Sequence, residues 1–257
     1  MTPCPHIHGV LDAGVLRIAI DRPAKKNALT IAMYAALAAL LLRAARDDAV
    51  RVVLIEGAAT VFTSGNDLHD FIEHPPENFE APVFQFLRTL AHLGKPVLAA
   101  VTGDAIGIGT TLLLHCDHVV AGRSARFALP FVKLGLCPEA ASSLLLPQLI
   151  GYQRAAEMLL FGEPIAATQA LDWGLVQRVV DDADTFAAAR ERAARLAALA
   201  PAALAATKAL LRRHAWSAVD AAMRDEAVLF DPLLRGADTR ALLAAFLNRN
   251  PLQERPR

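Results

Sequence analysis

Alternating and continuous apolar runs divide the first part of the chain into predicted strands and helices. Two short alternating runs, residues 6–11 and 14–21, are typical of paired strands joined by a tight turn. Residues 50–57 form a nearly continuous β-branched run, which favours a strand buried on both faces. Between these runs, Thr30 can cap an apolar helix over residues 31–46. This order predicts an α/β fold with a mostly parallel sheet and helices outside it.

Further along the chain the pattern changes from strands to helices. More strands are expected at residues 97–103, 118–122, 125–129 and 175–180, the last of them within a helical region that starts near residue 140. The final segment carries an apolar stripe formed by Leu204, Leu210, Leu211, Val219, Met223 and Leu229. Such a stripe needs a surface to bury it, in its own core or on a neighbouring subunit. We therefore divide the chain into a core, residues 1–198, and a C-terminal helical region, residues 199–257.

The composition is that of a globular protein with ample apolar material. Of the 257 residues, 54% are hydrophobic and 20% are charged, which excludes disorder, collagen and coiled coil. Lys plus Arg and Asp plus Glu both number 26, so the net charge is zero and we expect no nucleic-acid partner held by a global basic field. Cys4, Cys116 and Cys137 lack metal-ligand spacing, and we expect neither a disulfide framework nor a bound metal.

No targeting or membrane segment is evident. The N-terminus lacks a basic region followed by an apolar run. The longest apolar stretch, residues 31–42, is about 12 residues and too short to span a bilayer. We expect a cytoplasmic protein without a membrane span.

Common nucleotide-binding and hydrolase motifs are not met. Gly107 and Gly109 follow a predicted strand, but Leu112 stands where the dinucleotide fingerprint has its third glycine. Ser64 lies in TSG rather than in the GxSxG sequence of hydrolases. We expect no cofactor.

Two glycine-containing turns, at residues 64–68 and 107–109, lead from a strand into a helix. Turns of this kind point backbone N–H groups outward at the positive end of a helix. On neighbouring parallel strands, two such turns can aim two donors at one oxygen and form an oxyanion hole. The alternative is that both are ordinary connections, which the spacing alone favours.

Glu139 follows a proline in an apolar neighbourhood, and two roles are open to it. It can be a first-turn acid that stabilises a helix beginning at Ala140, which the local sequence favours. It can also be a partly buried general base with a raised pKa.

Several stretches together resemble the crotonase superfamily, which comprises enoyl-CoA hydratases and isomerases. They occur in the right order from about residue 17 to 180 and read IDRPAKKNALT, VFTSGNDL, KPVLAAVTGDAIGIGTTLLLHCD, ARFALPFVKLGLCPEAASSLLLPQLIG and AAEMLLFGEPIAATQALDWGLVQRVV. The resemblance implies a spiral of ββα units, a C-terminal helical trimerisation region and acyl-CoA substrates, with coenzyme A as part of the substrate. It also implies that the protein is a homotrimer or a dimer of trimers.

Site residues follow from the same resemblance. The oxyanion-hole donors would be the backbone N–H groups of Asn66 and Ile108. The coenzyme A channel would be lined by two segments: Lys25, Lys26 and Ala28, and then Ser64, Gly65, Asn66, Asp67 and Leu68, with Gly107 and Ile108 beside them. The two lysines can meet phosphates or lie in a solvated turn.

Carboxylates distinguish the subfamilies. Hydratases of the family carry two catalytic glutamates, and the matching positions here are Thr111 and Phe131. Glu139 instead matches the single glutamate of the Δ3,Δ2-enoyl-CoA isomerases. The resemblance therefore implies such an isomerase. The alternatives are a hydratase with relocated acids, another crotonase-fold acyl-CoA enzyme such as a ring-modifying isomerase, or a non-catalytic acyl-CoA-binding partner.

Overall fold

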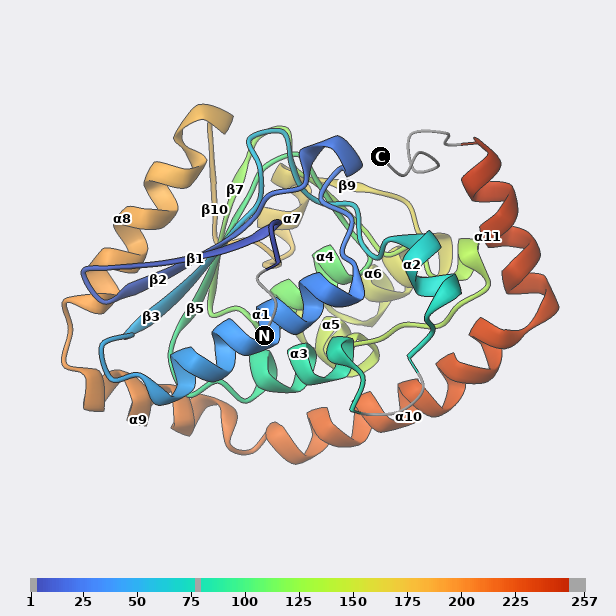
Figure 1. Ribbon diagram of the computed structural model, residues 1–257. Coiled ribbons are helices and arrows are strands. Elements are labelled where there is room, and N and C mark those ends of the chain that lie inside the picture. The colour runs from blue at the N-terminus through green and yellow to red at the C-terminus, as the bar shows by residue number, and fades with distance from the viewer. Residues whose placement is uncertain (1–3, 77–79, 250–257) are drawn as a thin grey trace.

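The computed structural model describes residues 4–76 and 80–249 and contains two sheets (Figure 1). The larger sheet has six strands in the order β1 (Ile7–Asp12), β2 (Val15–Ile20), β3 (Val52–Glu56), β5 (Val97–Val101), β7 (His118–Gly122) and β10 (Arg178–Val180). β1 and β2 are antiparallel, and every other neighbouring pair is parallel. The mostly parallel sheet predicted from the sequence is confirmed.

The smaller sheet has four short strands: β4 (Val61–Thr63), β6 (Asp104–Ile106), β8 (Arg126–Ala128) and β9 (Ile165–Ala166). β4, β6 and β8 run parallel, and β9 pairs antiparallel with β8. Each of β3, β5 and β7 is followed within a few residues by a strand of this sheet. The chain thus repeats a strand in each sheet, which is the expected spiral.

The helices cover both faces of the larger sheet. On one face lie α1 (Ile31–Arg46) and α3 (Pro82–Ala91), and on the other α8 (Thr185–Ala197). The remaining helices are α2 (Leu68–Glu73), α4 (Ile108–Thr111), α5 (Ser142–Ile150), α6 (Tyr152–Ala156), α7 (Ala167–Asp172), α9 (Pro201–Arg212), α10 (Trp216–Arg235) and α11 (Ala237–Arg249). Along β3, Val53 and Ile55 belong to one apolar cluster while Val52 and Leu54 belong to the other. This alternation confirms that the strand is buried on both faces.

The helices α9, α10 and α11 pass around the outside of the core, as Figure 1 shows. Within the predicted apolar stripe, Val219 and Met223 are buried, whereas Leu210, Leu211 and Leu229 are exposed. The stripe is therefore only partly buried within the chain itself. The predicted division at residues 198 and 199 stays a prediction, and residues 1–3, 77–79 and 250–257 within its two parts lie outside the described residues.

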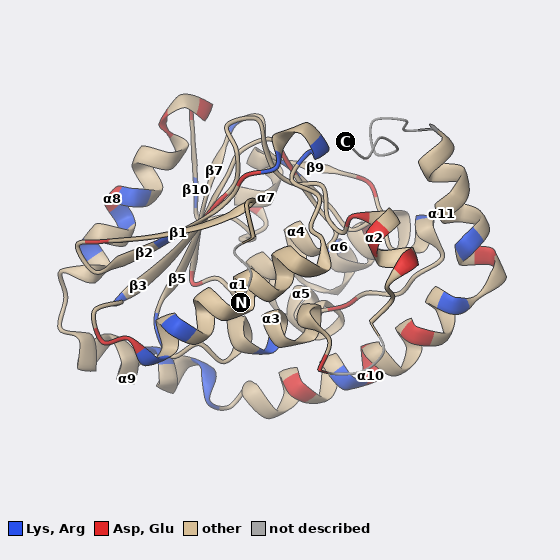
Figure 2. Ribbon diagram, viewed as in Figure 1, with Lys and Arg blue, Asp and Glu red and all other residues tan. Residues whose placement is uncertain are grey.

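Lys, Arg, Asp and Glu residues occur mainly in the outer helices and the loops, while the inner strands contain few of them (Figure 2). Of the residues described, no single helix is long and apolar enough to cross a membrane. Residues 182–197 and 201–212 together reach the length and composition of a span, but they meet at 106°. The first of these segments includes α8, which packs against the larger sheet.

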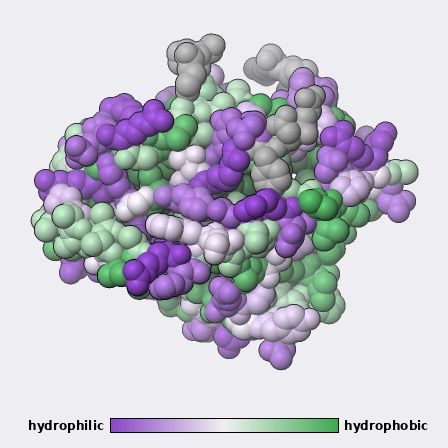
Figure 3. Space-filling model, turned by 90° about the horizontal axis from the view of Figure 1, so that it is seen from below, coloured by the Kyte–Doolittle hydropathy of each residue, from purple (hydrophilic) through white to green (hydrophobic). Residues whose placement is uncertain are grey.

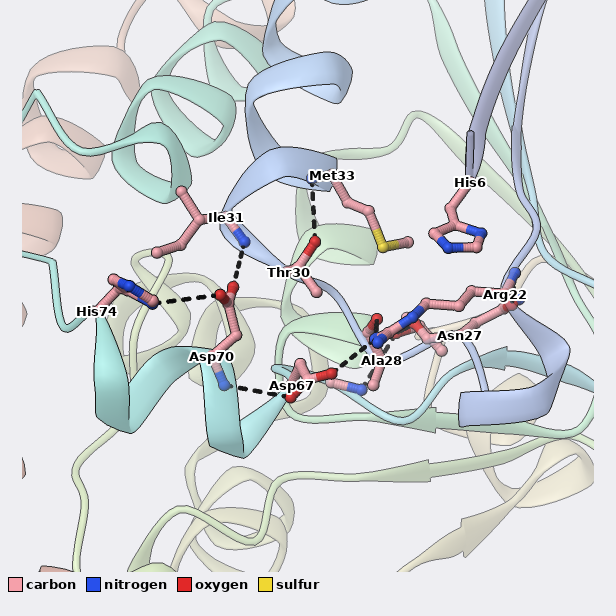
Figure 4. A network of polar contacts seen from close by, with 12 residues as sticks. His6, Arg22, Asn27, Ala28, Thr30, Ile31, Met33, Asp67, Asp70 and His74 are labelled. Carbon is pink, nitrogen blue, oxygen red and sulfur yellow. Dashed lines mark hydrogen bonds and ion pairs between the residues drawn. The ribbon is translucent and has the colours of Figure 1, made fainter. Parts of the chain in front are cut away.

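Asn27 ties the loop after β2 to the end of β4. Its side chain is fully buried, and Nδ2 donates to the carbonyl oxygens of Ile20, Val61 and Phe62 at 3.0–3.2 Å. Its Oδ1 accepts from the backbone N–H of Arg22 at 2.7 Å. The network continues through Arg22, whose Nη1 lies 2.6 Å from Asp67 Oδ2 (Figure 4). These hydrogen bonds thus hold together the two segments that the resemblance assigned to the coenzyme A channel.

Replacing Asn27 with alanine should lower the free energy of unfolding by about 3 kcal/mol, because buried carbonyl and N–H groups lose their partner. Urea denaturation followed by circular dichroism measures the change. Asn248→Ala, at an exposed position on α11, is the matched control and should change stability by less than about 0.5 kcal/mol. Equal stability of the Asn27 variant and the wild type would contradict the role given to this network.

Candidate active site

The loops that follow β4 and β6 lie against each other because these strands are parallel neighbours. Gly65 and Gly109 make this approach possible. A Cβ at Gly65, which has φ of +93°, would lie 2.9 Å from the carbonyl oxygen of Ile106. A Cβ at Gly109 would lie 2.7 Å from the side chain of Thr63. Larger residues at either position would push the two loops apart.

Each loop carries one of the predicted backbone donors. Ile108 is the first residue of α4, so its N–H has no partner within the helix. Asn66 immediately precedes Asp67, which caps α2 by accepting from the N–H of Asp70. Among the described residues, neither the Asn66 N–H nor the Ile108 N–H has an acceptor. Both groups are therefore available to a ligand oxygen, as an oxyanion hole requires.

Glu139 lies before α5 rather than in its first turn. The helix begins at Ser142, and Ala140 and Ala141 between them adopt the left-handed conformation, with φ of +62° and +57°. The local interpretation of Glu139 as a first-turn acid of a helix beginning at Ala140 is therefore wrong. These two residues turn the chain so that Glu139 is separated from the helix.

The carboxyl group of Glu139 is partly buried and accepts a hydrogen bond from Thr111 Oγ1 at 2.5 Å. Burial raises the pKa of Glu139 to about 8; the hydrogen bond from Thr111 opposes this rise and the negative charge of Glu226 adds to it. A carboxyl group with this pKa can both accept and return a proton near neutral pH. Thr111 is the last residue of α4, the helix that begins at Ile108. One short helix therefore connects a backbone donor with the candidate base.

Tyr34 makes a contact with Asn66 that the sequence did not predict. Its hydroxyl group donates a hydrogen bond to Asn66 Oδ1 from the buried side of α1. The pKa of Tyr34 is raised well above its usual value by burial, and further by Glu139 and Asp70, so the hydroxyl keeps its proton. The bond holds the Asn66 side chain and leaves the Asn66 N–H free. The only sign of Tyr34 in the sequence was a hydroxyl group among the apolar residues at the start of the predicted helix.

A cavity of about 670 Å³ lies beside the two loops. Its lining includes eight of the predicted binding residues: Lys25, Lys26, Ser64, Gly65, Asn66, Leu68, Gly107 and Ile108. The other two lie elsewhere. Ala28 is buried with its carbonyl oxygen bonded to Arg22, and the Asp67 carboxylate pairs with the same arginine.

The cavity also has walls that the sequence did not predict. Phe230 of α10 and Phe246 of α11 line it, so the C-terminal helices of the chain cover it from outside. Lys133 joins Lys25 and Lys26 in the lining and brings a third ammonium group to the cavity. Three lysines suit a ligand that carries phosphate groups.

A second cavity, of about 490 Å³, lies between α1 and the start of α3. Phe71 lines both cavities, and Leu29, Ile31 and Tyr34 form an apolar part of the second. Among residues 4–76 and 80–249, no group of three His, Cys, Asp or Glu side chains is arranged to hold a metal ion.

The sequence relatives of the chain include both isomerases and hydratases. It is 39% identical over 201 residues to the 1,2-epoxyphenylacetyl-CoA isomerase of Escherichia coli, which covers 74% of this chain and 75% of that protein. It is 37% identical over 238 residues to the 2,3-dehydroadipyl-CoA hydratase of the same species, with 91% and 92% covered. It is 32% identical over 246 residues to the enoyl-CoA delta isomerase 2 of Rattus norvegicus, covering 93% of this chain and 63% of that protein.

A comparison with solved structures and a comparison with protein families give the same result as the sequence relatives. The structure of Pseudomonas aeruginosa OdaA superposes with a TM-score of 0.94 at 44% identity, covering 96% of this chain and all of that one. The family description of enoyl-CoA hydratase/isomerase matches residues 11–254. The chain therefore belongs to the enoyl-CoA hydratase/isomerase family of enzymes, within the crotonase superfamily.

Proposed function

We propose that this member of the family is a Δ3,Δ2-enoyl-CoA isomerase that uses Glu139 as its single proton shuttle. The observation that carries the proposal is the Thr111–Glu139 hydrogen bond. One of the two positions that hold catalytic glutamates in hydratases is occupied here by a neutral donor, which serves the remaining carboxyl group. Phe131, at the other hydratase position, is a buried side chain of the cavity wall.

The proposed reaction begins at C2 of a 3-enoyl-CoA, where the thioester and the double bond acidify the proton. Glu139 removes this proton, and the resulting dienolate carries negative charge on the thioester oxygen. The N–H groups of Asn66 and Ile108 stabilise this charge, each by about 3 kcal/mol. Glu139 then returns the proton at C4, and the double bond moves into conjugation. The sequence of steps balances without water, metal or redox cofactor.

Hydration makes different demands on the same site. A water molecule must be activated and positioned while C2 is protonated, and the resemblance assigns two carboxylates to this task. Among the described residues that line the larger cavity, Asp104 carries the one carboxylate and is exposed at the strand that precedes the second loop, whereas Glu139 is not part of this lining. The position of Asp104 differs from both hydratase positions, and we assign it no part in the proton transfer.

The two cavities suggest how the substrate would lie. Lys25, Lys26 and Lys133 would meet the phosphates of coenzyme A in the larger cavity. The apolar part of the smaller cavity, beyond Phe71, would take the acyl chain. The names of the relatives include both a ring-bearing and a linear acyl-CoA, and both kinds of acyl group remain open for this chain.

We further propose that the chain assembles into a homotrimer or a dimer of trimers. The exposed part of the C-terminal stripe supports this, since Leu211 is 78% and Leu229 is 60% exposed. Exposed apolar side chains that form a contiguous patch often mark an interface between subunits. Figure 3 shows apolar groups at the surface between hydrophilic ones.

Glu139→Gln keeps the shape of the side chain but cannot accept the C2 proton, so isomerisation should fall by about a hundredfold to ten-thousandfold. The rise in absorbance of the conjugated thioester measures it, and calorimetry should show unchanged binding of an acyl-CoA. Asp104→Asn removes the carboxylate that lines the larger cavity and should retain activity. Full activity in Glu139→Gln would refute the mechanism, and efficient hydration of a 2-enoyl-CoA by the wild type would refute the isomerase assignment.

Thr111→Val should move the acid limb of the pH–rate profile to higher pH. The hydrogen bond from Thr111 favours the ionised form of Glu139, so removing it raises the pKa of this base above about 8. The value of kcat/KM at pH 7 should fall and recover in alkaline buffer. Thr110→Val is the control, because its buried hydroxyl group bonds to the carbonyl oxygen of Ala105 instead. An unmoved limb in Thr111→Val would show that the bond does not tune the base.

Sedimentation at micromolar concentration should give a mass of three or six chains of 27.5 kDa. Leu211→Glu introduces a charge into the exposed apolar surface and should shift the distribution toward smaller species. A monomeric wild type would refute the proposed assembly.

A further inference from the structure

We propose that Glu226, in the C-terminal helix α10, is a positioning residue that holds Glu139 at its place in the site. The proposal rests on the function assigned to Glu139 above. It assigns a role to a buried carboxyl group that takes no part in the proton transfer. Glu226 is 6% exposed and reaches across to the segment between Glu139 and α5.

The carboxyl group of Glu226 accepts one hydrogen bond from this segment and two from the first turn of α5. Ala141 N–H donates to Oε2 at 2.7 Å, and Ser143 donates to Oε1 from its backbone N–H at 2.9 Å and from its hydroxyl group at 2.5 Å. Both oxygens of the carboxyl group are used. Glu226 therefore contacts the two residues that flank the start of α5.

The segment needs an outside partner because of its own sequence. Ala140 and Ala141 adopt left-handed conformations, which are unfavourable for alanine and persist only when the surroundings enforce them. Ala141 is also the N-cap of α5, and an alanine side chain cannot cap a helix. Glu226 supplies the missing acceptor from another helix and stabilises the turn that presents Glu139.

His115 makes a further hydrogen bond to the same turn. Its Nε2 donates to the carbonyl oxygen of Ala140 at 2.8 Å, and burial lowers the pKa of His115 to about 4, so the ring is neutral. With Thr111 on the Glu139 carboxyl group itself, the turn is fixed at three points. Of these three, Glu226 alone brings a second carboxyl group close to the base.

Proximity of the two carboxyl groups makes the proposal testable by titration. The charge of Glu226 raises the pKa of Glu139, and the other polar groups near that base are Tyr34, Thr111 and the Cys137 thiol. The pKa of Glu226 is itself raised by burial and lowered by its bonds to Ser143 and Ala141. The other titratable groups that face Glu226 are the Cys137 thiol and Asp225, its neighbour on α10.

Glu226→Gln removes the charge and replaces one acceptor oxygen with an amide donor. The pKa of Glu139, followed by carbon-13 NMR of labelled glutamate carboxyl groups and assigned with Glu139→Gln, should fall relative to the wild type. In the isomerase assay the acid limb should move to lower pH, and kcat at the plateau should fall by about tenfold or more with KM little changed. Asp225→Asn removes an exposed charge from the adjacent position of the same helix and should change none of these quantities.

The possible outcomes separate this inference from the proposed function. A folded Glu226→Gln variant with wild-type kcat and an unmoved Glu139 pKa overturns the positioning role, even when the wild type is an isomerase. A wild type that does not isomerise 3-enoyl-CoA overturns the proposed function, while the NMR titration still tests the electrostatic interaction between the two carboxyl groups. If Glu226→Gln does not fold, Glu226→Asp keeps the charge but withdraws it by one methylene. This variant should lower kcat, and a wild-type kcat in it overturns the proposal.

Discussion

The hydrogen bond from Thr111 to Glu139 is the contact on which the arrangement of the site depends. It joins α4, which begins with the Ile108 donor, to a turn that precedes α5. Neither segment alone brings the proposed base close to the proposed backbone donors. The short parallel strands of the smaller sheet bring the second donor loop to the same place, because β4 and β6 are neighbours. The relative position of base and donors is therefore set by backbone pairing and one side-chain contact.

The cost of burying the Glu139 carboxyl group appears as its raised pKa, and the structure limits that cost with neutral donors. Thr111 bonds to the carboxyl group directly, and the neutral ring of His115 bonds to the turn that follows it. The C-terminal helices add a third connection, since α10 carries both Glu226 and a wall of the cavity, Phe230. A segment outside the two sheets thus contributes both to the shape of the cavity and to the place of the base.

The sequence predicted helices and strands where the hydrophobic pattern extends over many residues. It did not predict those in which the pattern is only a few residues long. The buried strand at residues 52–56 and the helix after Thr30 were predicted because each offers several residues of one period. The three-residue strands β4 and β6 offer no such pattern, and they were not among the strands predicted from the sequence. The position of Glu139 outside the helix depends on left-handed alanines, a conformation that no alanine signals in advance. Contacts between distant segments, such as Tyr34 with Asn66 and Glu226 with Ser143, leave no local trace in the sequence.

The residue at position 111 of α4 bears on which proton transfers the proposed site can support. A carboxyl group at residue 111 would stand beside Glu139, and two carboxylates at this distance cannot both ionise freely. One of them would remain protonated and could act as an acid, although the resemblance places the second carboxylate of a hydratase at the position of Phe131. The threonine present here donates a hydrogen bond to Glu139 and keeps its own proton. Under the proposed mechanism, a single proton-exchanging group beside two backbone donors would take a proton from one carbon and return it to another, which is a double-bond shift.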